Sequence, residues 1–217
     1  CVVTIHGINT SPRYLGVESQ RRYFRQALNR CDRVVLVGEP LRPFFADLCG
    51  RDDHFRVVHN GFRLTGIPTE SRIICDGPVT RLISVSNLHE GKGIDLVLRA
   101  LIQLKAKGVD NWHYTIVGDG YERPKLERLV AEADLESRVT FTGAVPHAEV
   151  AGLLWQADLF VLPSYREAFG IAYLEAMACG LAAIGVVGQG AAEFIRHGEN
   201  GLLVPPRHLP VLAHAYL

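Results

Sequence analysis

The sequence predicts an α/β protein built from doubly wound parallel sheets, and three observations support this fold class. Short apolar runs recur along the chain with little polar alternation, as in strands that are buried on both faces. Amphipathic stretches of about ten to fifteen residues separate them, the usual length of helices that alternate with parallel strands. Right-handed crossovers between such units give a sheet with helices on both sides.

The expected elements follow one another in a regular order. The expected strands are VVTI (2–5), RVVLV (33–37), FRVV (55–58), RLISVS (81–86), HYTIV (113–117), RVTF (138–141), LFVL (159–162) and AAIG (182–185). The expected helices are ESQRRYFRQALNR, GIDLVLRALIQLKAKG, RPKLERLVAEADL, HAEVAGLLWQA and GIAYLEAMACG.

This rhythm breaks once, between Asn60 and about Thr80, where turn residues occur without sustained periodicity. We therefore expect a partial N-terminal domain over 1–62, an interdomain linker over 63–79 and a C-terminal domain over 80–217. Only about three strand–helix steps precede the break, which is too few for a complete doubly wound domain. The chain opens inside a strand and closes inside a helix, so we expect a piece of a longer protein.

Composition narrows the class of function. Lys+Arg and Asp+Glu both total 23, so the formal net charge is zero and no nucleic-acid partner is expected. No apolar run approaches the ~18 residues that suggest a membrane span. The 5 cysteines are scattered and form no CxxC pair, which indicates neither a disulfide framework nor a zinc site. We expect reduced thiols in a cytoplasmic protein.

Glycine-bearing turns follow several predicted strands, at the sheet edge where α/β proteins bind ligands. In NLHEGKG, Gly91 and Gly93 flank Lys92 just before a helix, which fits either a phosphate site or a plain turn. GDGYERPKLE resembles a dinucleotide fingerprint, but Arg123 takes the place of its third glycine, so the evidence for NAD is weak. The remaining turns are Gly143 and the GQG segment (188–190) before Glu193.

Two acids stand out in the segment PSYREAFGIAYLEAMACG. Glu167 lies in the loop after a strand, and Glu175 lies in the following helix, which ends at Gly180. A fully helical span would separate the acids by ~12 Å, too far for the ~5 Å carboxylate pair of a retaining glycosidase. Two such acids suit an extended ligand, with hydroxyls at both ends and phosphates at the helix N-terminus between them.

A nucleotide-sugar has this layout. The alternative is an acid at a helix start and a second, solvated acid. Ile171, Leu174 and Met177 leave little free surface around Glu175, which favours a binding role.

The chain resembles the group 1 (family 4 type) retaining glycosyltransferases. That resemblance implies the GT-B architecture, two facing Rossmann-like domains, of which the N-terminal one is incomplete here. The most specific matching piece is the segment with two glutamates eight positions apart. The matching pieces, in the family's order, are VVTIHG, RVVLVGEPL, VVHNG, SVSNLHEGKGID, TIVGDGYERPKLE, VTFTGAVPHAEV, ADLFVLPSYREAFGIAYLEAMACG and HGENGLLVPP.

The resemblance also implies roles for individual residues at a site between the domains. Glu167 would contact the transferred sugar, with the backbone of Phe169, Gly170 and Ile171 nearby. His6 would face that sugar from the N-terminal domain.

The nucleotide part of the donor would be bound by the C-terminal domain. Glu175 would bind the ribose, Lys92 the diphosphate, and Gly120 and Val145 would lie near the nucleotide. No metal cofactor is expected, because cationic side chains and a helix dipole offset the charge of the leaving diphosphate. The anomeric configuration would be retained.

The chain departs from the family pattern at three positions. Asn87 stands where an arginine is usual and supplies neither its charge nor its bidentate fork. Ala168 replaces a common glycine, and Ala182 replaces a common proline.

The acceptor stays open between a glycan, a lipid-linked molecule and a small molecule, and the oligomeric state is not indicated. A nucleotide-sugar epimerase, an inactive nucleotide-sugar-binding module and, more distantly, an NAD dehydrogenase are the alternatives. The arginines and aromatic residues of ESQRRYFRQALNR suggest the hypothesis of peripheral contact with the inner face of the membrane, against a simple solvated helix face.

Overall fold

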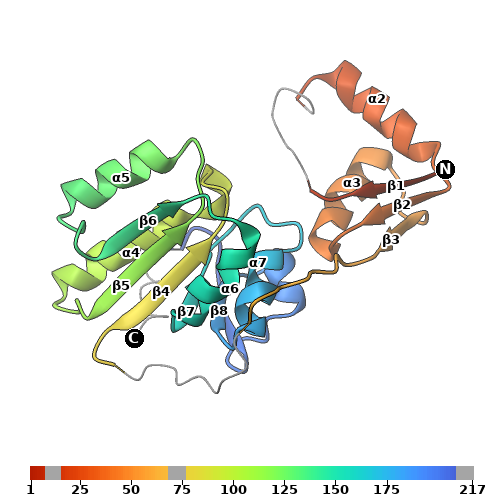
Figure 1. The fold of residues 1–217 in the computed structure, drawn as a ribbon. Helices are drawn as coiled ribbons and strands as arrows, with labels where there is room; N and C mark the ends of the chain where they lie inside the picture. Colours follow the sequence, from red (N-terminus) through yellow and green to blue (C-terminus); the bar gives the residue numbers. More distant parts are fainter. Residues whose placement is uncertain (8–15, 68–76, 209–217) are drawn as a thin grey trace.

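A computed structural model describes residues 1–7, 16–67 and 77–208. It contains two parallel sheets, one with strand order β1-β2-β3 and one with order β6-β5-β4-β7-β8-β9 (Figure 1). The second order is that of a doubly wound sheet, in which successive units are added outward from the central strands. The predicted fold class is confirmed.

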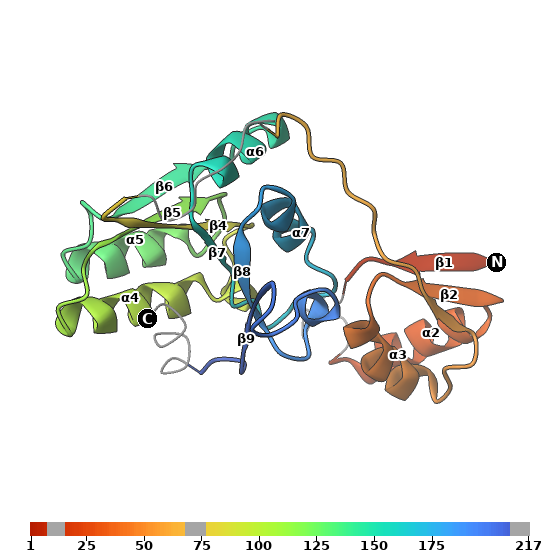
Figure 2. The ribbon, with the colours of Figure 1, turned by 90° about the horizontal axis from the view of Figure 1, so that it is seen from below.

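The N-terminal sheet is formed by short strands with two helices on one face (Figure 2). Its elements are β1 (Val2–Ile5), α2 (Glu18–Asn29), β2 (Arg33–Leu36), a 3-10 turn (Glu39–Leu41), α3 (Arg42–Cys49) and β3 (Phe55–Val57). Val34 and Leu36 on β2 are fully buried, whereas α2 buries only Leu28. The helix α3 was not among the expected elements, because it is short and has a proline at its second residue.

The C-terminal sheet carries α4 and α5 on one face and α6 and α7 on the other (Figure 2). Its strands are β4 (Thr80–Val85), β5 (Trp112–Val117), β6 (Val139–Gly143), β7 (Leu159–Val161), β8 (Ala182–Val186) and β9 (Gly201–Val204). Its helices are α4 (Ile94–Ala106), α5 (Arg123–Glu132), α6 (His147–Trp155) and α7 (Ile171–Ala178), with 3-10 turns at Glu90–Lys92 and Gly190–Glu193. All expected strands and helices are present, and β9 is additional.

The interdomain linker expected at 63–79 lies partly outside the described residues, because residues 68–76 are not among them. The domain boundaries therefore stay a prediction. The described helices include none long and apolar enough to cross a bilayer.

Two hydrophobic cores are separate except at one place. The large core of the C-terminal domain is built around Tyr114, Phe160 and Tyr173, which are fully buried. The smaller core gathers residues of β2, α3 and β3, and it also includes Phe169 from the loop after β7. The carboxyl edges of the two sheets therefore meet where Phe169 leaves one domain and packs against the other.

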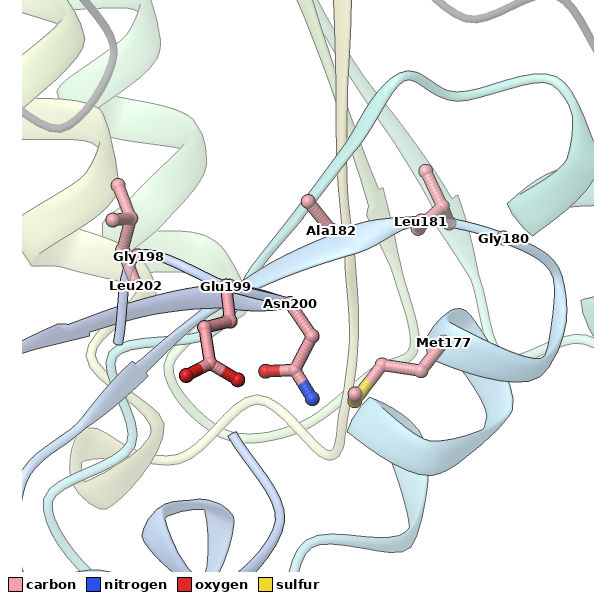
Figure 3. Close-up of a pocket in the computed structure, with 9 residues that line it drawn as sticks. Met177, Gly180, Leu181, Ala182, Gly198, Glu199, Asn200 and Leu202 are labelled. Carbon is pink, nitrogen blue, oxygen red and sulfur yellow. The ribbon is translucent and has the colours of Figure 1, made fainter. Parts of the chain in front are cut away.

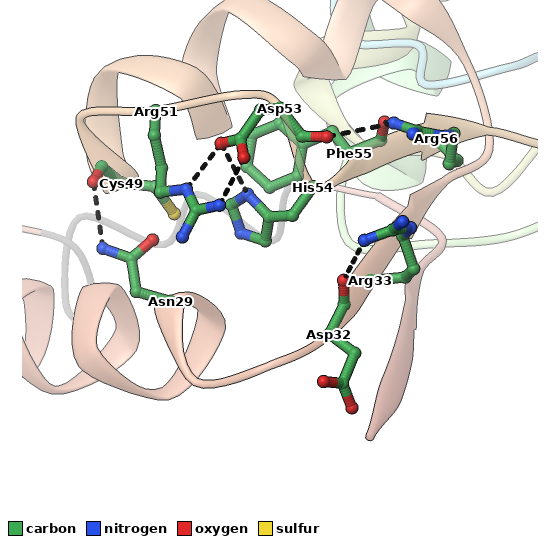
Figure 4. Close-up of polar contacts among 9 residues, drawn as sticks. All are labelled: Asn29, Asp32, Arg33, Cys49, Arg51, Asp53, His54, Phe55 and Arg56. Carbon is green, nitrogen blue, oxygen red and sulfur yellow. Dashed lines mark hydrogen bonds and ion pairs between the residues drawn. The ribbon is translucent and has the colours of Figure 1, made fainter.

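The opposite edge of each sheet, where the strands begin, carries polar contacts in the N-terminal sheet and a cavity in the C-terminal sheet. At the amino ends of β2 and β3, Arg51 pairs with Asp53 at 2.5 Å, and the Asn29 amide donates to the Cys49 carbonyl at 3.0 Å (Figure 4). A shallow cavity of about 500 Å³ lies where β8 and β9 begin, and Ala182 is among its lining residues (Figure 3).

Candidate donor site at the carboxyl edge of the C-terminal sheet

The loop between β7 and α7 holds Glu167 through its backbone. The Glu167 N–H donates to Oε1 of Gln189 at 3.0 Å, and the Glu167 carbonyl accepts the Gly190 N–H at 3.0 Å. A Cβ atom on Gly190 would lie 2.4 Å from Cα of Phe169, so only glycine allows this close approach. The glycine-bearing turn after β8 therefore fixes the loop that carries the first acid.

The Glu167 side chain forms an ion pair with Lys92. Nζ of Lys92 lies 2.7 Å from Oε2 of Glu167, and the two side chains are only 17% and 12% exposed. The loop that carries Lys92 is fixed by the Gly91 carbonyl, which accepts the Tyr165 N–H at 3.0 Å and the Ser164 hydroxyl at 3.2 Å. Two residues predicted to bind different parts of a ligand thus neutralise one another.

The helix α7 begins directly after Gly170, which has a φ of 95° in the left-handed region. A Cβ atom there would also lie 2.8 Å from the Tyr173 ring, so conformation and space both require glycine. Phe169 is buried, and Ile171 is the first residue of the helix. The free N–H groups of this first turn are the kind that bind anions.

Glu175 lies in the second turn of α7 and is 7% exposed. Its Oε1 is 2.9 Å from Nε2 of His147, the first residue of α6, whose side chain is 57% exposed. A nearly buried carboxylate is therefore paired with an exposed histidine. Val145 lies two residues before His147, and Gly120 follows β5 at the same sheet edge.

The loops around Lys92 carry three further polar side chains, those of His89, Arg166 and Asn87. Burial lowers the pKa of His89, and the positive charges of Lys92 and then Arg166 lower it further, although Glu167 opposes them. Arg166 is exposed, and its stem packs against Gly91. Asn87 is exposed and follows β4, as expected from its position.

His6 is exposed and follows β1 at the carboxyl edge of the N-terminal sheet. It therefore lies at the predicted edge. Arg123, at the third glycine position of the dinucleotide-like motif, forms ion pairs with Asp119 at 3.0 Å and Glu127 at 2.7 Å. That turn is therefore held by side chains of its own helix start.

Sequence reasoning missed three residues that shape the site. His147 pairs with Glu175, Gln189 accepts the Glu167 N–H, and the His59 ring stacks on Phe169 with centroids 5.1 Å apart. The only available signal was that His147 and Gln189 follow predicted strands, and that His59 follows FRVV. Their partners lie far away in the sequence, so no local pattern could identify them.

Comparison with known proteins identifies the family. The profile described as "Glycosyl transferases group 1" matches residues 76–215, which is more than half of the chain. This chain belongs to the group 1 glycosyltransferases. The match covers the lysine-bearing loop and both glutamates described above.

Similar proteins include a colanic acid biosynthesis glycosyltransferase and a kanosaminyltransferase. The chain is 34% identical over 167 residues to a putative colanic acid biosynthesis glycosyltransferase, WcaL, of Salmonella typhimurium, covering 74% of this chain and 38% of WcaL. It is 33% identical over 140 residues to the alpha-D-kanosaminyltransferase of Streptomyces kanamyceticus, covering 64% of this chain and 36% of that enzyme. The chain thus spans well under half of the length of these relatives.

Solved structures of glycosyltransferases share the fold of this group 1 chain. Anabaena Alr3699/HepE in complex with UDP and glucose superposes with a TM-score of 0.80 at 22% identity, covering 99% of this chain and 61% of HepE. TarM superposes with a TM-score of 0.80 at 19% identity, covering 98% of this chain and 42% of TarM. The GT-B architecture expected from the sequence is therefore confirmed.

Proposed function

We propose that this chain is the donor-binding part of a retaining glycosyltransferase that transfers a hexose-type sugar from a nucleotide-sugar. The main supporting observation is the placement of Glu167 and Glu175 on either side of the α7 N-terminus, each paired with a basic side chain. An extended ligand with hydroxyls at both ends and a diphosphate in the middle matches this arrangement. HepE, which has the same fold, was solved with UDP and glucose.

In this proposal the two acids bind different parts of the donor. Glu167 accepts hydrogen bonds from the sugar, beside the backbone of Phe169, Gly170 and Ile171. Glu175 accepts them from the ribose, because its carboxylate is nearly buried and pairs with His147 at the start of α6.

The remaining donor contacts surround the diphosphate and the base. Lys92 binds the diphosphate, and its present pairing with Glu167 means that the donor must share or replace an existing ion pair. Gly120 and Val145 lie near the nucleotide, Asn87 lies near the phosphates, and His6 approaches the sugar from the N-terminal domain.

During transfer, negative charge develops on the leaving diphosphate. The Lys92 ammonium group and the first N–H groups of α7 stabilise that charge without a metal ion. The acceptor attacks on the face that the nucleotide leaves, so the anomeric configuration is retained. The acceptor is a glycan, a lipid-linked molecule or a small molecule.

Two other functions use the same donor site. A nucleotide-sugar epimerase would release free sugar when no acceptor is present, and a binding module would bind the nucleotide without turnover. Product formation with an added acceptor separates the transferase from the epimerase. We expect this fragment alone to be inactive, so binding without any turnover supports the binding module only when it is found for the full-length protein in a mixture of acceptors.

Isothermal titration calorimetry of the 217-residue chain with UDP, GDP and ADP tests the proposed donor site. We expect one nucleotide to bind at a single site and more tightly than its nucleoside. Absence of binding by all three nucleotides would contradict the proposed function.

A further inference from the structure

The two domains meet at a hydrogen-bonded cluster centred on Glu193. Its Oε2 lies 2.7 Å from Nε2 of His59, and its Oε1 accepts the backbone N–H of Glu39 at 2.9 Å. Both partners belong to the N-terminal side of the interface, one just after β3 and one just after β2. The Glu193 side chain is only 15% exposed. Each carboxylate oxygen is therefore occupied by a group from the other domain.

The same histidine holds the loop that carries the first donor acid. The His59 ring is stacked on Phe169, with centroids 5.1 Å apart and an interplanar angle of 29°. Phe169 is 5% exposed and belongs to the hydrophobic core of the N-terminal domain. Beside it, a Cβ atom on Gly38 would lie 2.1 Å from the Ala168 carbonyl oxygen, so the two backbones touch.

These contacts connect directly to Glu167. The segment 189–193 binds the Glu167 backbone through Gln189 and Gly190 at one end and carries Glu193 at the other. A shift of the N-terminal domain would therefore move Phe169 and Glu193 together. The Glu167 backbone lies between them.

We propose that His59 and Glu193 are positioning residues. Their contact, which we call the clasp, holds the two domains together and places Glu167 for the sugar of the donor. This inference rests on the proposed function, because it assigns a purpose to the placement of Glu167. A largely buried carboxylate is costly unless it is paired, and in some proteins such a pair fixes one arrangement of the structure. Glu175, Gly120 and Val145 lie entirely within the C-terminal domain, so the nucleotide part of the donor does not depend on the clasp.

The test uses the 217-residue chain and conservative variants. Glu193→Gln keeps an acceptor for the Glu39 N–H but removes the charge, and His59→Phe keeps a ring against Phe169 but removes the Nε2–H donor. His59→Ala removes both contacts. The matched controls are Glu199→Gln, whose glutamate pairs with Arg196 on an exposed turn, and His113→Ala, whose ring contacts Thr140 within the C-terminal sheet.

Calorimetry compares each nucleotide with its sugar conjugate, using UDP with UDP-glucose, GDP with GDP-mannose and ADP with ADP-glucose. For the pair that wild type binds, we expect His59→Ala and Glu193→Gln to reduce the ratio of sugar-conjugate to nucleotide affinity by about tenfold. The nucleotide affinity itself should change less than about twofold, and the controls should match wild type. An unchanged ratio in folded Glu193→Gln and His59→Ala overturns the clasp.

Small-angle X-ray scattering of the ligand-free proteins tests whether the two domains stay in contact, independently of ligand binding. We expect a larger radius of gyration for His59→Ala than for wild type and His113→Ala, with His59→Phe between them. An identical scattering profile for all four proteins overturns the clasp. Failure of the wild-type protein to bind any nucleotide contradicts the proposed function instead, and the scattering result still stands by itself.

Discussion

Nζ of Lys92 lies 2.7 Å from Oε2 of Glu167, so the cation expected to bind a diphosphate already neutralises the acid expected to bind a sugar. Both side chains are largely buried, which makes the pair more than a surface contact. Under the proposed function, donor binding has to redistribute this charge.

Lys92→Ala should lower the free energy of unfolding by about 1–3 kcal/mol, because it leaves the Glu167 carboxylate poorly solvated and without its ion-pair partner. It should also weaken binding of the nucleoside diphosphate more than binding of the nucleoside, since only the charged ligand gains from the lysine. Urea denaturation and calorimetry measure the two effects. Lys125→Ala is the control, because its ion pair with Glu122 has the same 2.7 Å length but a lysine that is 53% exposed. Equal nucleotide binding by wild type and Lys92→Ala would show that the Lys92 loop is not part of the nucleotide site.

Asn87→Arg should increase affinity for the nucleoside diphosphate and make that affinity more sensitive to salt. The substitution adds a cation at an exposed position near the predicted phosphates, and ions screen such a charge. Calorimetry at two salt concentrations measures both changes. A loss of affinity would indicate that another basic residue, such as Arg166, already supplies this cation. If Arg166 is that residue, Arg166→Ala should weaken diphosphate binding in the otherwise wild-type chain.

The stability of the fold should fall on mild acidification because of His89. Burial holds the pKa of His89 below its ordinary value of 6.5, so the folded state binds its proton less readily than the unfolded state. The unfolded chain therefore gains more protons as the pH falls below about 6.5, and the free energy of unfolding decreases until the folded-state pKa is passed. Denaturation experiments between about pH 8 and pH 5 should show that the free energy of unfolding depends less on pH for His89→Gln than for wild type. Equal pH dependence of the two proteins would contradict this prediction, with His113→Gln as the control.

The chain should bind vesicles that contain anionic lipid at low salt, through α2. Tyr23 is 70% exposed and Phe24 is 43% exposed beside Arg22 and Arg25, which lets aromatic rings and positive charges face a membrane together. Co-sedimentation should decrease at moderate salt and in the double variant Tyr23→Ser, Phe24→Ser. Tyr121→Ser is the matched control, because that tyrosine is 74% exposed in the C-terminal domain. Absence of vesicle binding at low salt would end the hypothesis.

Local sequence patterns were sufficient for most of the architecture. The strands from β4 to β8 and the helices between them follow from apolar runs and amphipathic repeats that each domain core buries. The strand β9 was missed because GLLV lies between glycine-rich turns and prolines, which mask so short an apolar run. Its identity as a strand depends on pairing with β8, which is a tertiary contact.

The residues that pair with the predicted site residues could not be predicted from the sequence. Glu167 and Glu175 were identified by their spacing, but Lys92 and His147 meet them only because parallel strands bring distant loops to one sheet edge. The contact of His59 with Glu193 joins two domains across 134 positions of sequence. Such pairings depend on the register of the sheets and on domain placement, which periodicity does not encode.

In the proposed function, Glu175 binds the ribose and Glu167 binds the sugar of one donor. Calorimetry of Glu175→Ala and Glu167→Gln separates these two roles. It uses the nucleotide that wild type binds best among UDP, GDP and ADP, and the sugar conjugate of that nucleotide. We expect Glu175→Ala to weaken the sugar-free nucleotide by about tenfold or more, since charge-assisted hydrogen bonds are lost from a buried carboxylate. Glu167→Gln should leave that affinity undiminished and weaken only the sugar conjugate. Unchanged binding of the sugar-free nucleotide by Glu175→Ala would contradict the ribose role of Glu175, and equal losses for both ligands in Glu167→Gln would contradict the sugar role of Glu167.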